Sequence, residues 1–178
     1  MKNIQDLAGH ELKWSQPHAL KMEYELHDGE ELVATLRFRS SFGSFATAEC
    51  ASGCWTFKRT GFWQTRVSVR ACDTNTDLAF FKNNTWANGG TLELPDGRKY
   101  PANTNFWGTS YEFKTEAGEP LVSFRRIEGL LHLSSAVDIQ PAALSLPELP
   151  WLVIFGWYLA IMLQMDSAAA AGSVAAVS

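Results

Sequence analysis

The stretch Leu149 to Leu163, LPWLVIFGWYLAIML, decides the fold of this chain. It holds fifteen residues without a charge or a side-chain amide. A helix over these residues is apolar on all sides, with Trp151 and Tyr158 among its rings, so it has no face to offer to solvent. Something must therefore enclose it.

The length of this run favours enclosure by protein over a membrane. A helix rises about 1.5 Å per residue and needs roughly twenty residues to cross a bilayer, while a run of about 10–14 is more typical of a buried core helix. No lysine or arginine follows Arg126, whereas membrane anchors usually have basic flanks. We expect a central helix over about 150–168 and a flexible Ala/Ser-rich tail over 168–178, with a tail anchor as the alternative.

The start of the helix is marked by residues that favour a first turn. Ser145 and Glu148 have the spacing of a capping box, and Pro147 and Pro150 remove amide donors that would otherwise lack partners. We expect a short turn over 145–148 and then the main helix. Glycine is unfavourable inside a helix, so Gly156 predicts a close neighbour there, such as a strand backbone.

The preceding part of the chain alternates apolar and polar residues between turns. Residues 20–27 place Leu20, Met22, Tyr24 and Leu26 on one face, and residues 32–39 repeat the pattern after Asp28-Gly29, which predicts a hairpin. Similar runs recur to residue 139. The predicted strands are 11–15, 20–27, 31–39, 44–50, 53–59, 62–71, 77–83, 90–94, 98–101, 105–114, 120–127 and 131–139.

The strands and the helix together predict the fold. An eight-stranded barrel is filled by its own side chains, whereas about twelve strands enclose a lumen of the order of one helix diameter. We therefore predict a mainly β protein, a closed antiparallel barrel of about 12 strands enclosing the hydrophobic C-terminal α-helix. Residues 1–178 form a single domain, with strands over about 11–139.

Composition narrows the function. A net charge of −4 and a pI near 5.5 argue against nucleic acid as a partner. The N-terminal segment has no apolar leader, and the three cysteines, Cys50, Cys54 and Cys72, are interpreted as reduced, buried small groups. We expect a cytoplasmic protein, either free or peripheral to the membrane.

No constellation for catalysis or for a metal emerges. Residues 73–77 resemble the opening of a calcium loop, but Leu78 stands where glycine should make the bend. The chain has neither a G-x-S-x-G elbow nor an H-E-x-x-H pair. We expect no enzyme activity, no cofactor, no metal and no small-molecule substrate. Phe106-Trp107 is interpreted either as core or as an exposed protein-binding spot.

Several motifs resemble the tubby C-terminal domain-like superfamily, which includes the phospholipid scramblases and the LURP-one-related proteins. They are Trp55 to Phe62, the LPDGRKY hairpin at 94–100, the GTSYEF run at 108–113, and the final helix. The resemblance implies a barrel around a central helix and a non-enzymatic module that binds anionic phospholipid, such as phosphatidylinositol bisphosphate, or a protein. A proline-rich N-terminal arm and an acidic calcium loop, which scramblases carry, are missing from the sequence.

The resemblance gives a meaning to one basic segment. Between Cys50 and Cys72 the chain has no acid and holds Lys58, Arg59, Arg66 and Arg70. If Thr60-Gly61 is a two-residue turn, Trp55 faces Arg66 and Lys58 faces Trp63. The four cations are then either an anionic headgroup site or an ordinary solvated face. A scramblase-like protein with a membrane-inserted helix and a barrel that carries an apolar ligand are further alternatives.

Overall fold

The structure is a computed structural model that describes residues 1–61, 65–84, 89–129 and 132–175, with side chains up to residue 171. These ranges hold twelve strands, two short 3-10 helices and one long helix. The strands are β1 (Leu12–Ser15), β2 (Glu23–Asp28), β3 (Glu31–Phe38), β4 (Ala46–Cys50), β5 (Gly53–Thr60), β6 (Arg66–Ala71), β7 (Asp77–Asn83), β8 (Gly89–Glu93), β9 (Lys99–Thr104), β10 (Ser110–Lys114), β11 (Pro120–Glu128) and β12 (Ser134–Ile139). The helices are η1 (Ile4–Asp6), η2 (Pro141–Ala143) and α1 (Leu149–Ala175).

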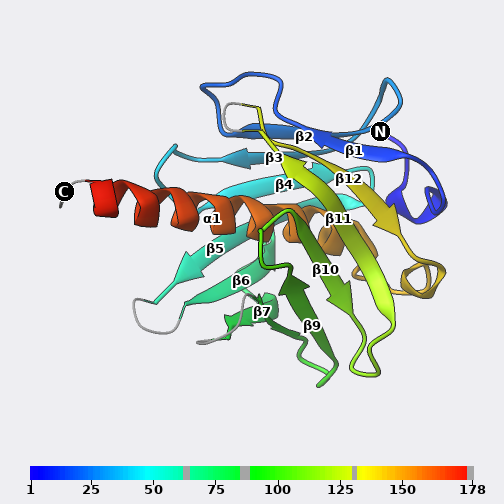
Figure 1. Ribbon diagram of the computed structural model, residues 1–178. Coiled ribbons are helices and arrows are strands. Elements are labelled where there is room, and N and C mark those ends of the chain that lie inside the picture. The colour runs from blue at the N-terminus through cyan, green and yellow to red at the C-terminus, as the bar shows by residue number, and fades with distance from the viewer. Residues whose placement is uncertain (62–64, 85–88, 130–131, 176–178) are drawn as a thin grey trace.

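The strand order confirms the predicted closed antiparallel barrel. Each strand pairs with its neighbours in the sequence, and β1 also pairs with β12, where Leu12 lies opposite Val137. Along most strands buried residues alternate with more exposed ones, because successive side chains point to opposite faces of the sheet. Figure 1 shows the strands wrapped around α1.

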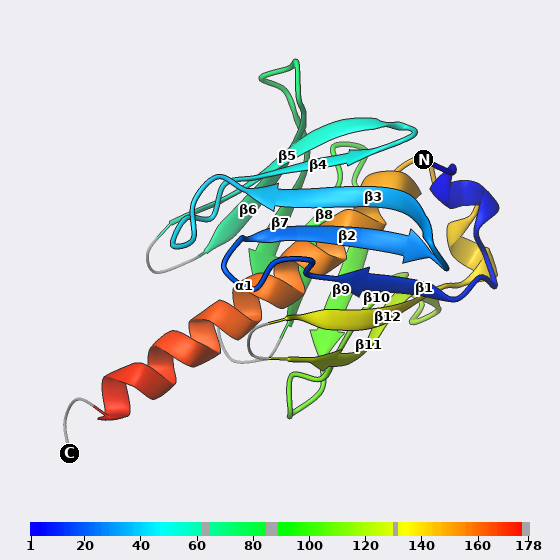
Figure 2. The same ribbon diagram turned by 90° about the horizontal axis from the view of Figure 1, so that it is seen from above.

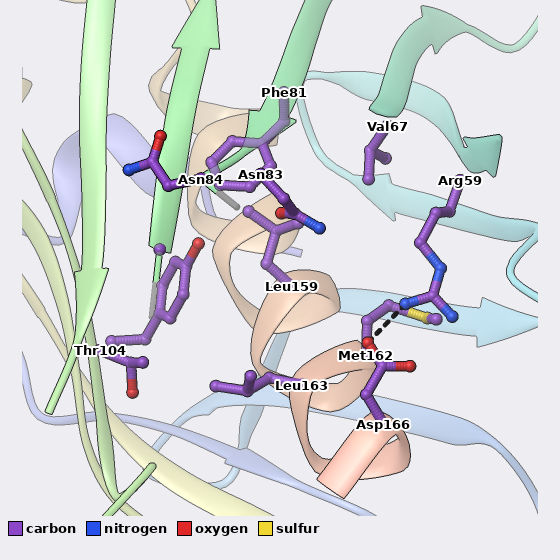
Figure 3. Close-up of a pocket in the computed structure, with 12 residues that line it drawn as sticks. Arg59, Val67, Phe81, Asn83, Asn84, Thr104, Leu159, Met162, Leu163 and Asp166 are labelled. Carbon is purple, nitrogen blue, oxygen red and sulfur yellow. Dashed lines mark hydrogen bonds and ion pairs between the residues drawn. The ribbon is translucent and has the colours of Figure 1, made fainter. Parts of the chain in front are cut away.

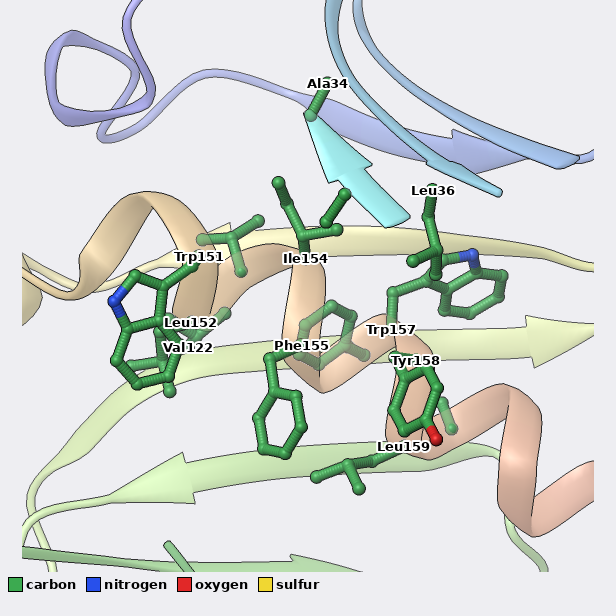
Figure 4. Close-up of a cluster of buried hydrophobic side chains, with 14 of the residues drawn as sticks. Ala34, Leu36, Val122, Trp151, Leu152, Ile154, Phe155, Trp157, Tyr158 and Leu159 are labelled. Atoms are coloured by element: carbon green, nitrogen blue, oxygen red, sulfur yellow. The ribbon is translucent and has the colours of Figure 1, made fainter. Parts of the chain in front are cut away.

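The core forms where the inner face of the barrel meets α1 (Figure 4). Residues 149–162 of the helix are all buried. The ring of Phe155 packs against those of Phe57, Phe81 and Phe113, with centroids 5.1 to 6.3 Å apart. Fully burying one large apolar side chain contributes about 1.5–3 kcal/mol, so this helix supplies much of the stability.

The predicted strand 20–27 begins later than expected. β2 starts at Glu23, and the amide of Gln16 donates to the backbone oxygen of Lys21 at 2.8 Å, which holds the preceding residues in a turn-containing connection. Leu20, expected to face the core, is instead 91% exposed. A local side-chain bond to the backbone has replaced ladder pairing here.

The predicted strand 105–114 is also shorter. β10 begins at Ser110, because the side-chain oxygen of Asn105 accepts the backbone N–H of Thr109 at 2.8 Å and closes a turn. Phe106 and Trp107 therefore lie in the β9–β10 connection, where they are exposed. Of the two interpretations of Phe106 and Trp107, burial in the core is therefore wrong.

The start of α1 differs from the predicted capping box. The helix begins at Leu149 after η2, and the backbone N–H of Leu149 donates to the carbonyl of Leu146. The carboxylate of Glu148 does not cap the segment at Ser145. It turns into the protein, where it accepts hydrogen bonds from Arg98.

Gly156 is tightly packed, as predicted, but its neighbours are rings and not a strand backbone. A Cβ added to Gly156 would lie 2.3 Å from the ring of Phe124 and 3.1 Å from that of Phe113. Glycine thus lets two inward-facing rings approach the helix axis.

The far end of the helix extends beyond the predicted end at residue 168. The structure describes α1 as far as Ala175, so the described part of the predicted Ala/Ser-rich tail over 168–178 is helical. Alanine has the highest helix propensity, and Ala168 to Ala171 continue the helix after the apolar run has ended.

Two of the three cysteines are paired, which corrects the expectation of reduced thiols. Cys54 and Cys72 form a disulfide, and Cys50 is free and buried. The pairing of β5 with β6 brings the two bridged cysteines together, because Trp55 lies opposite Ala71 and each cysteine is next to one of these residues. The cysteines therefore give no support to the expectation of a reducing compartment.

The helix makes the two ends of the barrel different. At the entry end, where α1 begins, Arg98 in the β8–β9 connection contacts Glu148. At the exit end, Gln164 donates to the carbonyl of Gly108 in the β9–β10 connection. Since the strands are antiparallel, the β1–β2, β3–β4, β5–β6, β7–β8 and β11–β12 connections also lie at the exit end. Figures 1 and 2 show α1 projecting from it.

Candidate functional site

A cavity of about 160 Å³ opens beside α1 at the exit end (Figure 3). Strand residues such as Val67 and Phe81 form one wall, and Leu159 and Met162 of the helix form the other. Arg59 and Asp166 lie at its rim. The cavity has a mixed lining, with Asn83 and Thr104 beside the apolar residues, and carries an ion pair at its opening.

Arg59 reaches this rim because it points into the barrel. It follows Trp55 and Phe57 on the inner face of β5 at alternate positions. Its guanidinium contacts the carboxylate of Asp166 on α1, with 2.7 Å between Nη1 and Oδ2. The pair ties the helix to the barrel wall at the point where the helix leaves it.

The other three predicted site residues lie apart from Arg59. Lys58 and Arg66 point outward and are exposed, while Arg70 forms an ion pair with Asp77. The guanidinium of Arg66 lies 3.4 Å from the centroid of the Phe80 ring. The structure therefore divides the four cations into two that form ion pairs and two for which the described ranges hold no ion pair. Of the latter two, Arg66 lies near Glu93, whose pKa is lowered mainly by its hydrogen bond with Lys82 and also by the charge of Arg66.

The predicted register of this hairpin is wrong. Thr60 lies opposite Arg66, and Lys58 lies opposite Ser68, because the connection runs from residue 61 to 65 and is longer than the assumed two-residue turn. A shift by an odd number of residues changes which positions share a face. Trp63, the expected partner of Lys58, lies outside the described residues.

A second cavity, of about 430 Å³, lies on another side of α1 at the exit end. Met22 and Tyr24 line it from the barrel, and Ile161 and Met165 line it from the helix. Burial raises the pKa of Tyr24 to about 12, so its hydroxyl stays protonated at neutral pH. The cavity offers apolar surface and no charge of its own.

Tyr158 fixes the helix to the exit end from inside. Its hydroxyl donates to the backbone carbonyl of Ser44 in the β3–β4 connection at 2.7 Å. Burial raises the pKa of Tyr158. The protonated hydroxyl is the form that can donate this bond.

The entry end carries a buried polar network that sequence reasoning missed. Glu148, whose side chain is 3% exposed, accepts hydrogen bonds from Arg98, at 2.6 Å from Nη1, and from the hydroxyl of Tyr100. The side-chain hydrogen bond to Asp96, followed by the one to Glu148, raises the pKa of Arg98, while burial is the main cause of the raised pKa of Tyr100. Arg98 and Tyr100 belong to the LPDGRKY hairpin, which the sequence motifs include. Their partner Glu148 lies fifty residues from Arg98, so no local pattern links them.

Within the described ranges, no group of three or more histidine, cysteine, aspartate or glutamate side chains is placed to hold a metal ion. Asp77, from the segment that resembles a calcium loop, contacts Arg70.

Comparison with known proteins identifies the fold only. No protein-family model matches the chain, and no curated protein matches it. The crystal structure of the Arabidopsis thaliana protein AT5G01750 is similar, with a TM-score of 0.52 and 10% identity over 91% of this chain and 96% of that one. The barrel with its helix is therefore an arrangement that also occurs in an experimental structure.

Proposed function

We propose that this chain is a non-enzymatic, tubby-like β-barrel module that binds anionic phospholipid surfaces from the exit end. The fold expected from the tubby resemblance, a closed barrel around an apolar helix, supports the proposal. A membrane leaflet rich in anionic lipid attracts basic segments by about 1 kcal/mol per lysine or arginine. A cytoplasmic protein that works at the periphery of the membrane fits this function.

The observation that carries the proposal is the separation of charge between the two ends. In sequence, the six exit-end connections contain no aspartate or glutamate, and they hold Lys21 and Arg39. The entry-end connections hold most of the turn acids, which are Glu30, Asp73, Asp96, Glu116 and Glu119. An acidic protein with one end free of acidic loops can approach an anionic surface in one orientation.

Lys58 and Arg66 extend this basic character along the outer wall. Arg66 is at the first position of β6, next to the exit end, and Lys58 is two residues from the end of β5. Because Arg59 and Arg70 already have carboxylate partners, they offer less to a lipid phosphate. We therefore assign the larger role to Lys58 and Arg66.

The alternatives use α1 or the lumen differently. By length and composition α1 could cross a membrane between Leu149 and Ala171, but 61% of its most apolar window is buried inside the barrel. A scramblase-like or anchored protein would have to withdraw these residues from the core. A carrier would have only the space that the helix leaves, such as the second cavity of about 430 Å³. The scramblase-like and anchored alternatives require a second arrangement of the same core.

Flotation with vesicles tests the proposal. Wild-type protein should bind vesicles made of equal amounts of phosphatidylcholine and phosphatidylserine, and should not bind pure phosphatidylcholine. Lys58→Gln combined with Arg66→Gln should lower the partition coefficient by about thirtyfold, since each cation contributes about 1 kcal/mol. Raising the salt concentration should weaken wild-type binding, because mobile ions screen exposed charges.

The paired arginines supply the matched control. Arg59→Gln combined with Arg70→Gln removes the same total charge, yet it should reduce binding less, because these guanidinium groups are already held by Asp166 and Asp77 and are not free to contact a lipid phosphate. Equal losses in the two double variants would show that only net charge matters. A wild-type protein that does not bind anionic vesicles would refute the proposal.

A further inference from the structure

The exit end exposes four large apolar side chains. Leu20 is 91% exposed, Phe42 99%, Phe106 83% and Trp107 79%. Apart from Met1 they are the only large apolar side chains in the described ranges that are exposed to this degree. All four lie in exit-end connections, although such residues more often pack into a core.

These side chains surround α1. Leu20 belongs to the β1–β2 connection, Phe42 to β3–β4, and Phe106 and Trp107 to β9–β10. In the closed barrel, β9 and β10 are several strands away from β1 to β4 in either direction. The apolar groups therefore form the rim of the exit end. We call Leu20, Phe42, Phe106 and Trp107 the apolar rim.

The helix continues this surface outward. After Asp166 the sequence holds no charge, and residues 167–171 of α1 are exposed. Figure 2 shows the helix projecting past the ends of the strands. The exit end is therefore convex, with a projecting uncharged helix and apolar side chains around it.

We infer that the apolar rim enters the boundary between headgroups and acyl chains of an anionic bilayer, with α1 directed toward the membrane. This inference rests on the proposed function and adds to it an orientation and an apolar contact. Tryptophan is favoured at this boundary because its ring is apolar and its N–H can stay in contact with water. Phenylalanine and leucine are typical of the apolar faces that interfacial segments bury there. Lys21 and Arg39 in the same connections are placed to meet the lipid phosphates.

A bilayer fits this surface better than a protein does. The apolar rim is spread over separate connections around a projecting helix and does not form one flat patch. A protein partner would need a deep concave surface of matching shape, whereas lipids rearrange around each side chain. The lack of acids in these connections complements anionic lipid directly.

Substitution of the apolar rim tests the inference on the intact chain. Phe42→Ser combined with Phe106→Ser should reduce the partition onto equal mixtures of phosphatidylcholine and phosphatidylserine by about tenfold or more, because two exposed rings no longer leave water. Phe42→Trp combined with Phe106→Trp should keep binding near the wild-type value. Ala117→Phe adds an exposed ring at the entry end and should leave binding unchanged.

A depth measurement gives a second readout that does not depend on affinity. An environment-sensitive fluorophore on Phe42→Cys should shift to the blue when vesicles are added, and the same label on Ala117→Cys should not. Both sites are exposed, whereas Cys50 is buried and the other cysteines are paired, so labelling is selective.

The outcomes separate the two proposals. If wild-type protein does not bind anionic vesicles, the proposed function is refuted and this inference with it. If it binds, but the serine variants bind equally well and the label at residue 42 does not shift, the charge-based function stands and the inference is overturned. Self-association in solution that depends on Phe42 and Phe106 would also overturn it, because a second copy would then cover the apolar rim.

Discussion

The entry end and the exit end of this barrel are built differently, although the same strands form both. At the entry end, η2 and the Arg98–Glu148–Tyr100 network cover the start of α1. At the exit end, two cavities flank the helix and large apolar side chains face solvent. Both ends hold the helix by polar contacts, but only the exit end also leaves cavities and apolar side chains open to contact. The features available for interaction are therefore gathered at one end of the barrel axis.

Truncation of α1 should have the largest effect on folding. A chain that stops after residue 145 loses all of α1 and should be insoluble or lack a cooperative unfolding transition, because the inner face has nothing to pack against. A chain that stops after residue 168 should stay folded, because the removed part of the helix lies outside the barrel. Solubility and thermal unfolding distinguish the two. Cooperative unfolding of the chain that stops after residue 145 would contradict the central role of the helix.

Gly156→Ala tests the middle of the helix, between the two ends. Alanine favours a helix by about 1 kcal/mol over glycine, but the new methyl would press on the ring of Phe124. Overpacking typically costs about 1–3 kcal/mol, so we expect a net loss in the free energy of unfolding, measured with denaturant. Ala168→Gly, on the exposed part of α1, is the control and should have a smaller effect. A more stable Gly156→Ala protein would show that the rings can move aside.

Glu148→Gln removes an ion pair at the entry end and tests how much this end contributes to stability. We expect a loss of about 1–2 kcal/mol in the free energy of unfolding, less than for a fully buried pair because Arg98 is 42% exposed. Asp166→Asn removes the matching pair at the exit end, where the acid is 53% exposed, and should cost less than about 1 kcal/mol. The reverse ranking would mean that the exit end holds the helix.

The smallest effect concerns Tyr24, which lines the exit-end cavity. Its pKa is about 12 in the folded protein, against about 10 when unfolded. The stability that this difference contributes is present below pH about 10 and is lost as the pH rises toward 12. Tyr24→Phe cannot ionise, so the midpoint of alkaline unfolding should rise by a fraction of a pH unit. Stability at neutral pH should change little, because the one hydrogen-bond partner of the hydroxyl among the described residues is the sulfur of Met22, a weak acceptor.

Most of the fold could be predicted because its main signals are local. The apolar run at 149–163 and the alternation of the strands depend on neighbouring residues, and both appear in the structure as expected. Leu20 was misplaced because a side-chain bond of Gln16 holds its connection in a turn, which alternation cannot reveal. The helix continues past its predicted end at residue 168, because loss of hydrophobicity does not stop an alanine-rich helix.

The details of the site could not be predicted for a different reason. The register of β5 and β6 depends on the length of one connection, and that length decided which cations share a face. The pairing of Arg59 with Asp166 joins residues more than a hundred positions apart. The exit-end charge pattern was present in the sequence, but only the topology shows that these connections meet at one end.

The pairing of β1 with β12 also has a consequence for biosynthesis. The first strand must wait for the twelfth, and the segment that fills the lumen leaves the ribosome after all of them. Contacts between such distant parts of a chain form slowly, and unpaired strands are prone to aggregate meanwhile. The barrel can therefore close around its core only after the segment through α1 has been synthesised.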